Sequence, residues 1–210
     1  MNEEAVKRLK KDIYMTKYCR INAYKRTKSW DSFLQCVLFV SNIGVIAGSI
    51  LSLINKSIEA YSYAILIASI ITFALSLFIS TKNFYSQSCE FKRTFNELER
   101  LEKLANDDNP NYELIRKQYD EVIRFSSNHE QQDLYRLKVE YFGNDIVTGN
   151  DILEGKDKKY WDKLYKKELA KDVLIKIGLS LGIYLVFIFF SFIISLIIKP
   201  FKRNEKGASK

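Results

Sequence analysis

Three apolar segments dominate the pattern of this 210-residue chain: 33–54, 60–81 and 177–198. Each is 22 residues long and contains no charged side chain. As α-helix, 22 residues extend roughly 33 Å, which matches a bilayer hydrocarbon core of about 30 Å. The pattern predicts that each segment crosses a membrane as a helix. Only residues 55–59 separate the first two segments, so we expect these to form a tight hairpin.

Residues 1–32 carry apolar side chains at helical spacing with Lys and Arg between them, and no Gly or Pro interrupts them. The apolar positions are Val6, Leu9, Ile13, Tyr14, Tyr18, Ile21 and Tyr24. This pattern predicts a basic amphipathic helix, with two interpretations of its apolar stripe. Either the stripe lies on the membrane surface, or it packs against other helices of the protein.

A seven-residue repeat follows the second apolar segment: Phe84, Phe91, Leu98 and Ala105. Leu101 and Leu104 widen the stripe, and no Gly or Pro occurs before Pro110. The repeat is of the coiled-coil type and predicts one continuous helix over about 60–105.

The remaining residues up to the third apolar segment predict shorter helices. Pro110 begins one, and Ser127 with Glu130 suggests a capping box for another that ends near Phe142. Gly143, Gly149 and Gly155 predict a loop. After this loop, a helix is expected to start near Asp157 and to continue into the third apolar segment. The predicted fold is an all-α membrane protein. Its predicted parts are an N-terminal amphipathic helix (1–32), a transmembrane hairpin (33–81), a cytoplasmic helical region (82–172), a C-terminal transmembrane helix (173–198) and a basic tail (199–210).

The net charge of +8 lies mostly beside the apolar segments. Residues 1–32 hold nine Lys or Arg against four acidic residues, whereas Lys56 is the one basic residue of the first connection. This asymmetry predicts a cytoplasmic N-terminus and a cytoplasmic 82–172 region. Basic residues flank the third segment on both sides, which leaves the side of the tail open. Because the positive charge lies at the membrane edges rather than on one soluble domain, direct nucleic-acid binding is not expected.

Small residues form one stripe on each apolar segment. They are Ser41, Gly44, Gly48 and Ser52 in the first, Ala64, Ala68, Thr72 and Ser76 in the second, and Gly178 and Gly182 in the third. In lipid, such stripes mark faces where helices approach closely. Two uses stay open: packing within the hairpin, or packing between copies of the chain.

Two amides lie in the first apolar segment, Asn42 near its middle and Gln35 near its start. Either they line an assembled pore, or they hydrogen-bond to a neighbouring helix. The three segments contain no Asp, Glu, Lys, Arg or His, which argues against a proton-coupled transporter or pump.

No pattern of catalytic residues is evident. His129 is the only histidine, and its polar neighbours favour a role at a helix start. The chain has no glycine-rich phosphate loop, and Cys19, Cys36 and Cys89 show no metal-ligand spacing and no disulfide pattern. We therefore expect no enzymatic activity, cofactor or metal.

The arrangement of a basic helix, a tight two-span hairpin and a short helical module resembles a known family. The residues that carry the likeness are Ala23–Trp30, Tyr85–Leu104, Tyr119–Ile123, Asn128, His129 and Asp133. They resemble the SLATT domain, the SMODS and SLOG-associating two-transmembrane effector of bacterial conflict systems. The subgroup often encoded beside reverse transcriptases looks closest. The likeness covers roughly residues 5–142, and the third apolar segment goes beyond its two-span core.

The resemblance implies an antiviral defence effector of the bacterial inner membrane. Such an effector oligomerises and perforates or depolarises the membrane, killing the infected cell in abortive infection. The trigger is either a partner protein, such as a signal-producing or sensor protein encoded nearby, or a nucleotide signal. The expected partners are thus the bilayer, further copies of the chain and that protein. The alternative is a membrane-anchored scaffold that recruits a soluble partner through its cytoplasmic helices.

Overall fold

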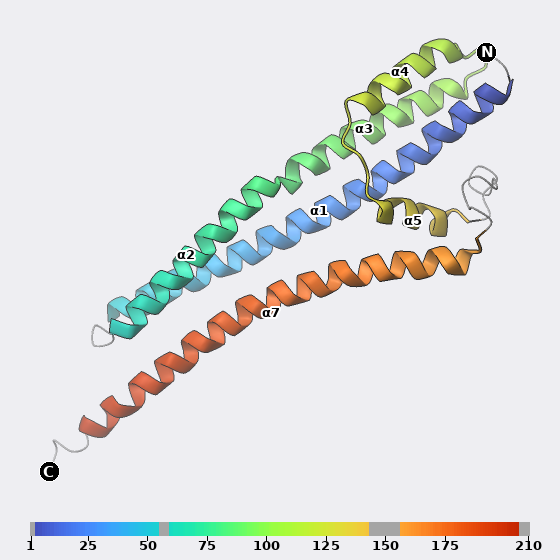
Figure 1. Ribbon diagram of the computed structural model, residues 1–210. Coiled ribbons are helices and arrows are strands. Elements are labelled where there is room, and N and C mark those ends of the chain that lie inside the picture. The colour runs from blue at the N-terminus through green and yellow to red at the C-terminus, as the bar shows by residue number, and fades with distance from the viewer. Residues whose placement is uncertain (1–2, 55–58, 143–155, 206–210) are drawn as a thin grey trace. The chain divides into compact units, whose positions relative to one another are not determined.

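The computed structural model describes residues 3–54, 59–142 and 156–205, and within these ranges every regular element is an α-helix (Figure 1). The helices are α1 (Glu3–Ile54), α2 (Glu59–Lys82), α3 (Phe84–Ala105), α4 (Tyr112–Arg124), α5 (Gln131–Glu140) and α7 (Lys158–Glu205). Side chains are described for residues 3–53, 62–142 and 156–182. The loop predicted around Gly143, Gly149 and Gly155 lies outside the described residues.

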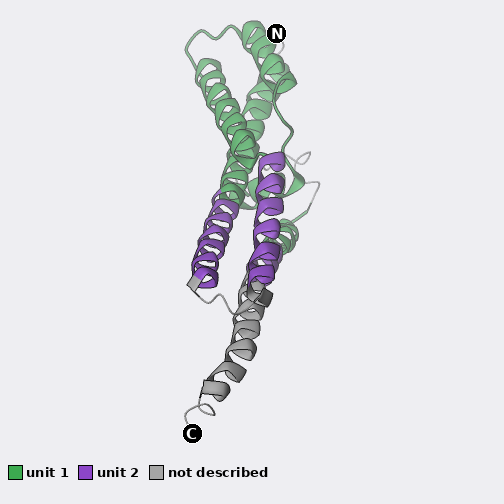
Figure 2. Ribbon diagram, turned by 90° about the vertical axis from the view of Figure 1, so that its left-hand side faces the viewer, with its two compact units in different colours: residues 1–31, 83–172 green, residues 32–82, 173–210 purple. Residues whose placement is uncertain are grey.

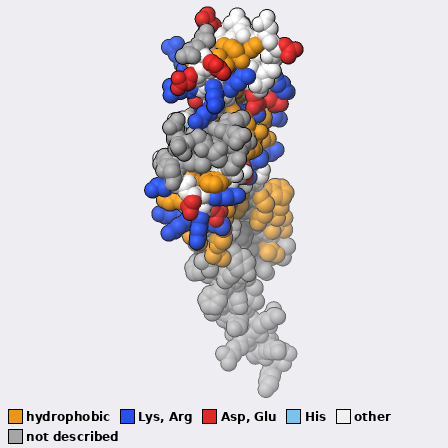
Figure 3. Space-filling model, turned by 90° about the vertical axis from the view of Figure 1, so that its right-hand side faces the viewer, with side chains coloured by type: hydrophobic (Ala, Val, Ile, Leu, Met, Phe, Trp, Pro, Cys, Tyr) orange, Lys and Arg blue, Asp and Glu red, His pale blue; other side chains and the backbone are white. Residues whose placement is uncertain are grey.

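The chain forms two compact units, coloured separately in Figure 2. Unit 1 consists of Met1–Asp31 and Asn83–Asp172, and unit 2 of Ser32–Lys82 and Val173–Lys210. Nearly all described charged side chains belong to unit 1, where basic and acidic groups are interspersed on the face that Figure 3 shows. Mixed signs of charge are typical of a solvated surface.

The core of unit 1 forms where α1, α3 and α4 pack together. Its fully buried side chains come from all three helices: Leu9, Ile13, Leu98, Leu101, Ala105 and Ile115. The heptad positions Phe91, Leu98 and Ala105 are buried as predicted, whereas Leu104 is 38% exposed and does not widen the stripe. The apolar stripe of α1 thus packs inside the protein, which is the second of the two interpretations given above.

A second cluster holds the start of α7. Trp161 is buried against residues of α1 and α5, among them Tyr14, Tyr135 and Val139. The ammonium of Lys138 lies 3.6 Å from the centroid of the Trp161 ring, within cation–π range. This aromatic residue therefore anchors the charged half of α7 in unit 1.

The prediction of one helix over 60–105 is wrong at a single residue. Asn83 adopts a left-handed conformation with φ 48° and ψ 47°, which ends α2 at Lys82 and lets α3 begin at Phe84. The Asn83 side chain accepts a hydrogen bond from the backbone N–H of Ser86 at 3.3 Å, capping α3. Asn is the non-glycine residue that most readily takes both roles, so the break needs neither Gly nor Pro.

Two helix starts also differ from prediction. Asn111, one residue after Pro110, caps α4 by accepting from the N–H of Leu114. The capping box of helix α5 lies three residues later than expected, at Glu130 and Asp133 rather than Ser127 and Glu130, and Asp133 accepts from the backbone N–H of Glu130 at 3.0 Å. Ser127 instead donates to Glu90 of α3, and α5 ends at Glu140.

Unit 2 contains helices with the length and composition of membrane spans. Two stretches, Glu3–Leu53 and Ser62–Ala105, each include an 18-residue apolar window, and only 11% and 17% of those windows is buried. A core helix of a soluble protein would be mostly buried, so the exposure favours lipid as the surroundings. The third apolar segment lies within α7, as predicted, but its side chains from residue 183 onward are outside the described set.

Candidate functional site

The predicted small-residue positions of the hairpin lie on both of its helices, α1 and α2. Ser41 and Ala64 are buried, with 6% and 8% exposure, although many of the large apolar side chains of these spans are exposed. Near the turn, the hydroxyls of Ser52 in α1 and Ser62 in α2 lie 3.0 Å apart and hydrogen-bond. This contact places the turn end of the small-residue face between α1 and α2, and the use of the whole face for close helix packing stays a prediction.

The other predicted small positions divide into two groups. Gly44, Gly48 and Ala68 are half-buried, in line with the same hairpin face. Gly178 and Gly182 of α7 are exposed, and a Cβ atom at either would meet no other atom of the chain within 4 Å. A role for this third pair in packing between copies stays a prediction.

The serine hydroxyls and the amides of the first span differ in whether they are hydrogen-bonded within their own helix. The hydroxyls of Ser41 and Ser49 donate to the carbonyls of Val37 and Val45, four residues earlier, and so are satisfied within their own helix. The amides of Asn42 and Gln35 are exposed. An amide has too many donors and acceptors to be satisfied this way, so these two side chains call for a partner outside the helix.

In unit 1 an ion-pair clamp joins α1 to the start of α5. The guanidinium of Arg26 donates from Nε and Nη2 to the two carboxylate oxygens of Asp133, at 3.2 and 3.0 Å. Its Nη1 lies 2.8 Å from Glu130 Oε1, and Asn22 donates to the Asp133 carbonyl at 3.1 Å. Asp133 is only 3% exposed. This bidentate, buried pair is the strongest polar connection to α5 among the described residues.

The segment between α4 and α5 is tied to two helices. Arg20 of α1 donates from Nη2 to Ser126 Oγ at 3.1 Å, and both the backbone N–H and the hydroxyl of Ser127 donate to Glu90 of α3 at 2.6 Å. Arg20 is 3% exposed, with its guanidinium 5.7 Å from the Phe91 ring centroid. Burial lowers the pKa of Arg20 from its ordinary value.

Sequence reasoning did not assign these roles to Arg20, Asn22, Arg26 or Glu90. The sequence marks Ala23–Trp30 through the family likeness, and Asp133 through that likeness and as part of the polar helix start around His129. Asn22 and Arg26 are four residues apart and so share one face of α1. Two polar residues on the inward side of an amphipathic helix indicate a polar contact with another helix, and this pair was the feature of the sequence from which the contact with α5 could have been predicted.

His129 lies in this segment but does not cap α5, which is the role its polar neighbours suggested. Its Nδ1 is buried and has no hydrogen-bond partner among the described residues. Burial and the nearby positive charge of Arg20 lower the pKa of His129 below its ordinary 6.5, against the opposing effect of Asp133. The folded protein therefore resists protonation at this position.

Acidification from about pH 7.5 to about pH 5.5 is expected to destabilise unit 1 through His129. As the pH falls through 6.5 the unfolded chain takes up a proton that the folded chain does not, so stability is complete above that value and declines below it. The thermal unfolding midpoint of the detergent-solubilised protein measures this. His129→Gln, which cannot titrate, should flatten the dependence; an unchanged pH slope in that variant contradicts the assignment.

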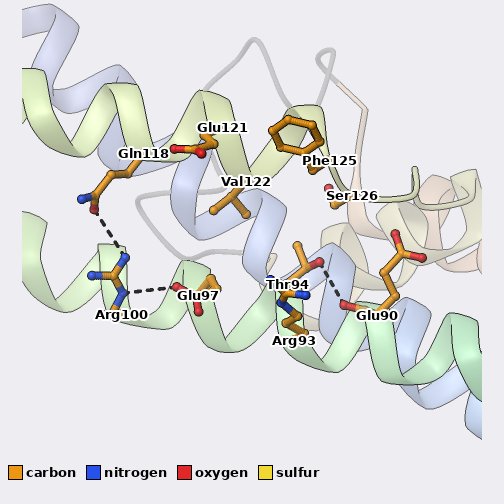
Figure 4. A pocket seen from close by; sticks show the side chains of 10 residues that line it. All are labelled: Glu90, Arg93, Thr94, Glu97, Arg100, Gln118, Glu121, Val122, Phe125 and Ser126. Atoms are coloured by element: carbon orange, nitrogen blue, oxygen red, sulfur yellow. Dashed lines mark hydrogen bonds and ion pairs between the residues drawn. The ribbon is translucent and has the colours of Figure 1, made fainter.

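A groove of about 380 Å³ lies between α3 and α4 (Figure 4). Phe125, 76% exposed, and Val122 give it an apolar wall, while Arg93, Arg100 and Glu121 bring charges of both signs to its rim. Arg100 is engaged by Glu97 and Gln118, as the dashed lines show. The mixed charges select no single class of ligand.

Within the part of the chain that the structure describes, no group of three or more His, Cys, Asp and Glu side chains gathers as a metal site would require. The three cysteines are free, and burial raises the pKa of Cys19 to about 12, which makes its thiol unreactive.

A helical hairpin whose apolar surface is largely exposed, joined to a charged helical unit, defines an all-helical membrane protein. The comparison with protein families agrees: a family model matches residues 2–197, and the chain belongs to the SMODS and SLOG-associating 2TM effector domain family 5 (SLATT_5). The chain is thus a membrane effector domain of that family.

The family match is longer than the likeness deduced from the sequence. It extends to residue 197 and so includes most of the third apolar segment, whereas the likeness seen in the sequence ends near residue 142. No curated protein and no solved structure matches the chain.

Proposed function

We propose that this chain is an effector of a bacterial anti-phage system that assembles in the inner membrane into a conducting oligomer and depolarises the cell. The observation that carries the proposal is the exposure of the apolar hairpin, since only 11% and 17% of its apolar windows is buried. Such a surface needs lipid and, for a conducting path, further copies of the chain. Membership of an effector-domain family supports the same conclusion.

The orientation follows from charge. Nine basic residues precede the first span and one follows it in the turn, so the N-terminus and unit 1 lie in the cytoplasm and the chain is multi-pass. There unit 1 receives the trigger from a signal-producing or sensor protein encoded nearby. Its role is mechanical rather than catalytic: the proposal assigns it no reaction, cofactor or nucleic-acid ligand.

Induced expression together with the neighbouring genes is expected to collapse the membrane potential, read with a potential-sensitive dye. Gly44→Leu places a large side chain on the hairpin's inner face and should abolish the collapse while the protein remains in the membrane fraction. Ile43→Leu is the matched control, because Ile43 is 51% exposed and one residue away; it should behave like the unsubstituted chain.

If the potential holds in every activating condition, the proposal fails. The competing function is then a membrane-anchored scaffold, which the α3–α4 groove with its exposed Phe125 favours. It predicts capture of a soluble partner by unit 1 without ion leakage, and Phe125→Ala should weaken that capture.

A further inference from the structure

One face of α1 within the membrane segment has no partner among the residues whose side chains the structure describes. Its members are Gln35, Phe39, Asn42, Ile46 and Leu53, all of them exposed, with Phe39 at 66%, Ile46 at 61% and Leu53 at 73%. At 100° per residue these five positions fall within about 60° of one another. We call them the amide stripe. By the same 100° per residue, its centre lies about 130° around α1 from the buried Ser41.

The spacing of the stripe is that of a helix–helix contact. Its positions recur at intervals of four, three and four residues from Gln35 to Ile46, and Leu53 continues the heptad seven residues later. Gln35 and Asn42 therefore occupy the same heptad position. A repeat of this kind keeps one seam facing another helix over several turns.

The amides restrict what can cover that seam. Asn42 lies about 14 Å along the helix axis from Phe33, near the middle of the hydrocarbon core. Lipid tails offer an amide neither donor nor acceptor, so an exposed Asn42 is costly there. A partner helix must present hydrogen-bonding groups at this depth and again about 10 Å nearer the membrane edge, where Gln35 lies.

A second copy of the chain meets both demands. Copies inserted in the same orientation carry the same amide at the same depth, and an amide is self-complementary because it has both donors and acceptor oxygen. We propose that the amide stripe is the surface on which copies of this chain associate in parallel, with Asn42 paired to Asn42 and Gln35 to Gln35. The inference rests on the proposed function, since it names the contact by which the effector assembles.

The test measures association of the full-length chain in liposomes by energy transfer between labelled copies as the lipid-to-protein ratio is varied. Asn42→Leu replaces the amide with an apolar side chain of similar size and is expected to lower the association constant about tenfold, within the range found for interhelical amide bonds in model peptides. Asn42→Gln retains the amide and should associate nearly as the unsubstituted chain does. A change within about twofold for Asn42→Leu overturns the proposal.

Cross-linking locates the contact. In a chain carrying Cys36→Ser and Cys89→Ser, Phe39→Cys should form disulfide-linked dimers on mild oxidation. Leu66→Cys is the control, since Leu66 is 56% exposed in α2 and outside the stripe. Equal or stronger cross-linking at Leu66 shows that another face mediates association and overturns the proposal.

Together with the membrane-potential assay, the association and cross-linking experiments distinguish failure of the proposed contact from failure of the proposed function. Association through the stripe without any loss of membrane potential contradicts depolarisation but leaves the contact established. Depolarisation by a chain whose association is insensitive to Asn42→Leu contradicts the contact and leaves the function standing.

Discussion

Asp133→Ala is expected to lower the free energy of unfolding of unit 1 by about 3–5 kcal/mol, because removing one partner of a buried ion pair leaves the other charge desolvated. Asp133 is 3% exposed and holds both Nε and Nη2 of Arg26. Thermal unfolding in detergent and hydrogen exchange of the α5 amides measure the loss.

Asp120→Ala is the matched control. Asp120 pairs with Arg116 at 3.1 Å, but both side chains are about half exposed, so this change should cost about 0.3–0.5 kcal/mol. Replacing both Arg26 and Asp133 with Leu should recover part of the loss, since no unpaired charge remains. Equal costs for the Asp133 and Asp120 variants would show that the clamp contributes no more than a surface pair.

Leu98→Ala is expected to cost about 2–5 kcal/mol. Leu98 is fully buried in the cluster formed by α1, α3 and α4, and its truncation leaves a cavity among Leu9, Leu101 and Ile115. Rigid neighbours from three helices cannot all collapse into that space. Denaturant unfolding of unit 1 within the full chain gives the value.

Leu104→Ala provides a comparison with the same residue type in the same helix. Leu104 is 38% exposed, so its truncation should change stability by about 0.5 kcal/mol or less. A similar cost at both positions would contradict the placement of the α3 stripe.

The helical core was readable from the sequence because its signal is local. Phe91, Leu98 and Ala105 repeat every seven residues, and this spacing alone places them on one face of α3. The same reasoning included Leu104 wrongly, because periodicity defines the direction of a stripe better than its width.

The break at Asn83 was missed for a physical reason. A search for Gly and Pro finds most helix ends, but Asn also tolerates the left-handed region and can cap the helix that follows. Lys82-Asn83-Phe84 carries no further mark that distinguishes it from a helix interior.

The clamp lay beyond sequence reasoning because its partners are distant along the chain. Arg26 and Asp133 are 107 residues apart, and no periodicity connects them. The sequence identifies the amides of the first span, Gln35 and Asn42, but not the groups that partner them. It took the burial pattern to show that Ser41 faces inward while Asn42 does not.

Asp133 serves two purposes with one carboxylate, since Oδ2 accepts from the backbone of Glu130 and from Arg26, each at 3.0 Å. Helix α5 has only 10 residues, fewer than the roughly 12–15 that an isolated helix needs in water. Detachment from α1 would therefore also unravel α5. Docking and folding of this short helix are thus cooperative, and a stimulus acting on it would produce an all-or-none response rather than a graded one.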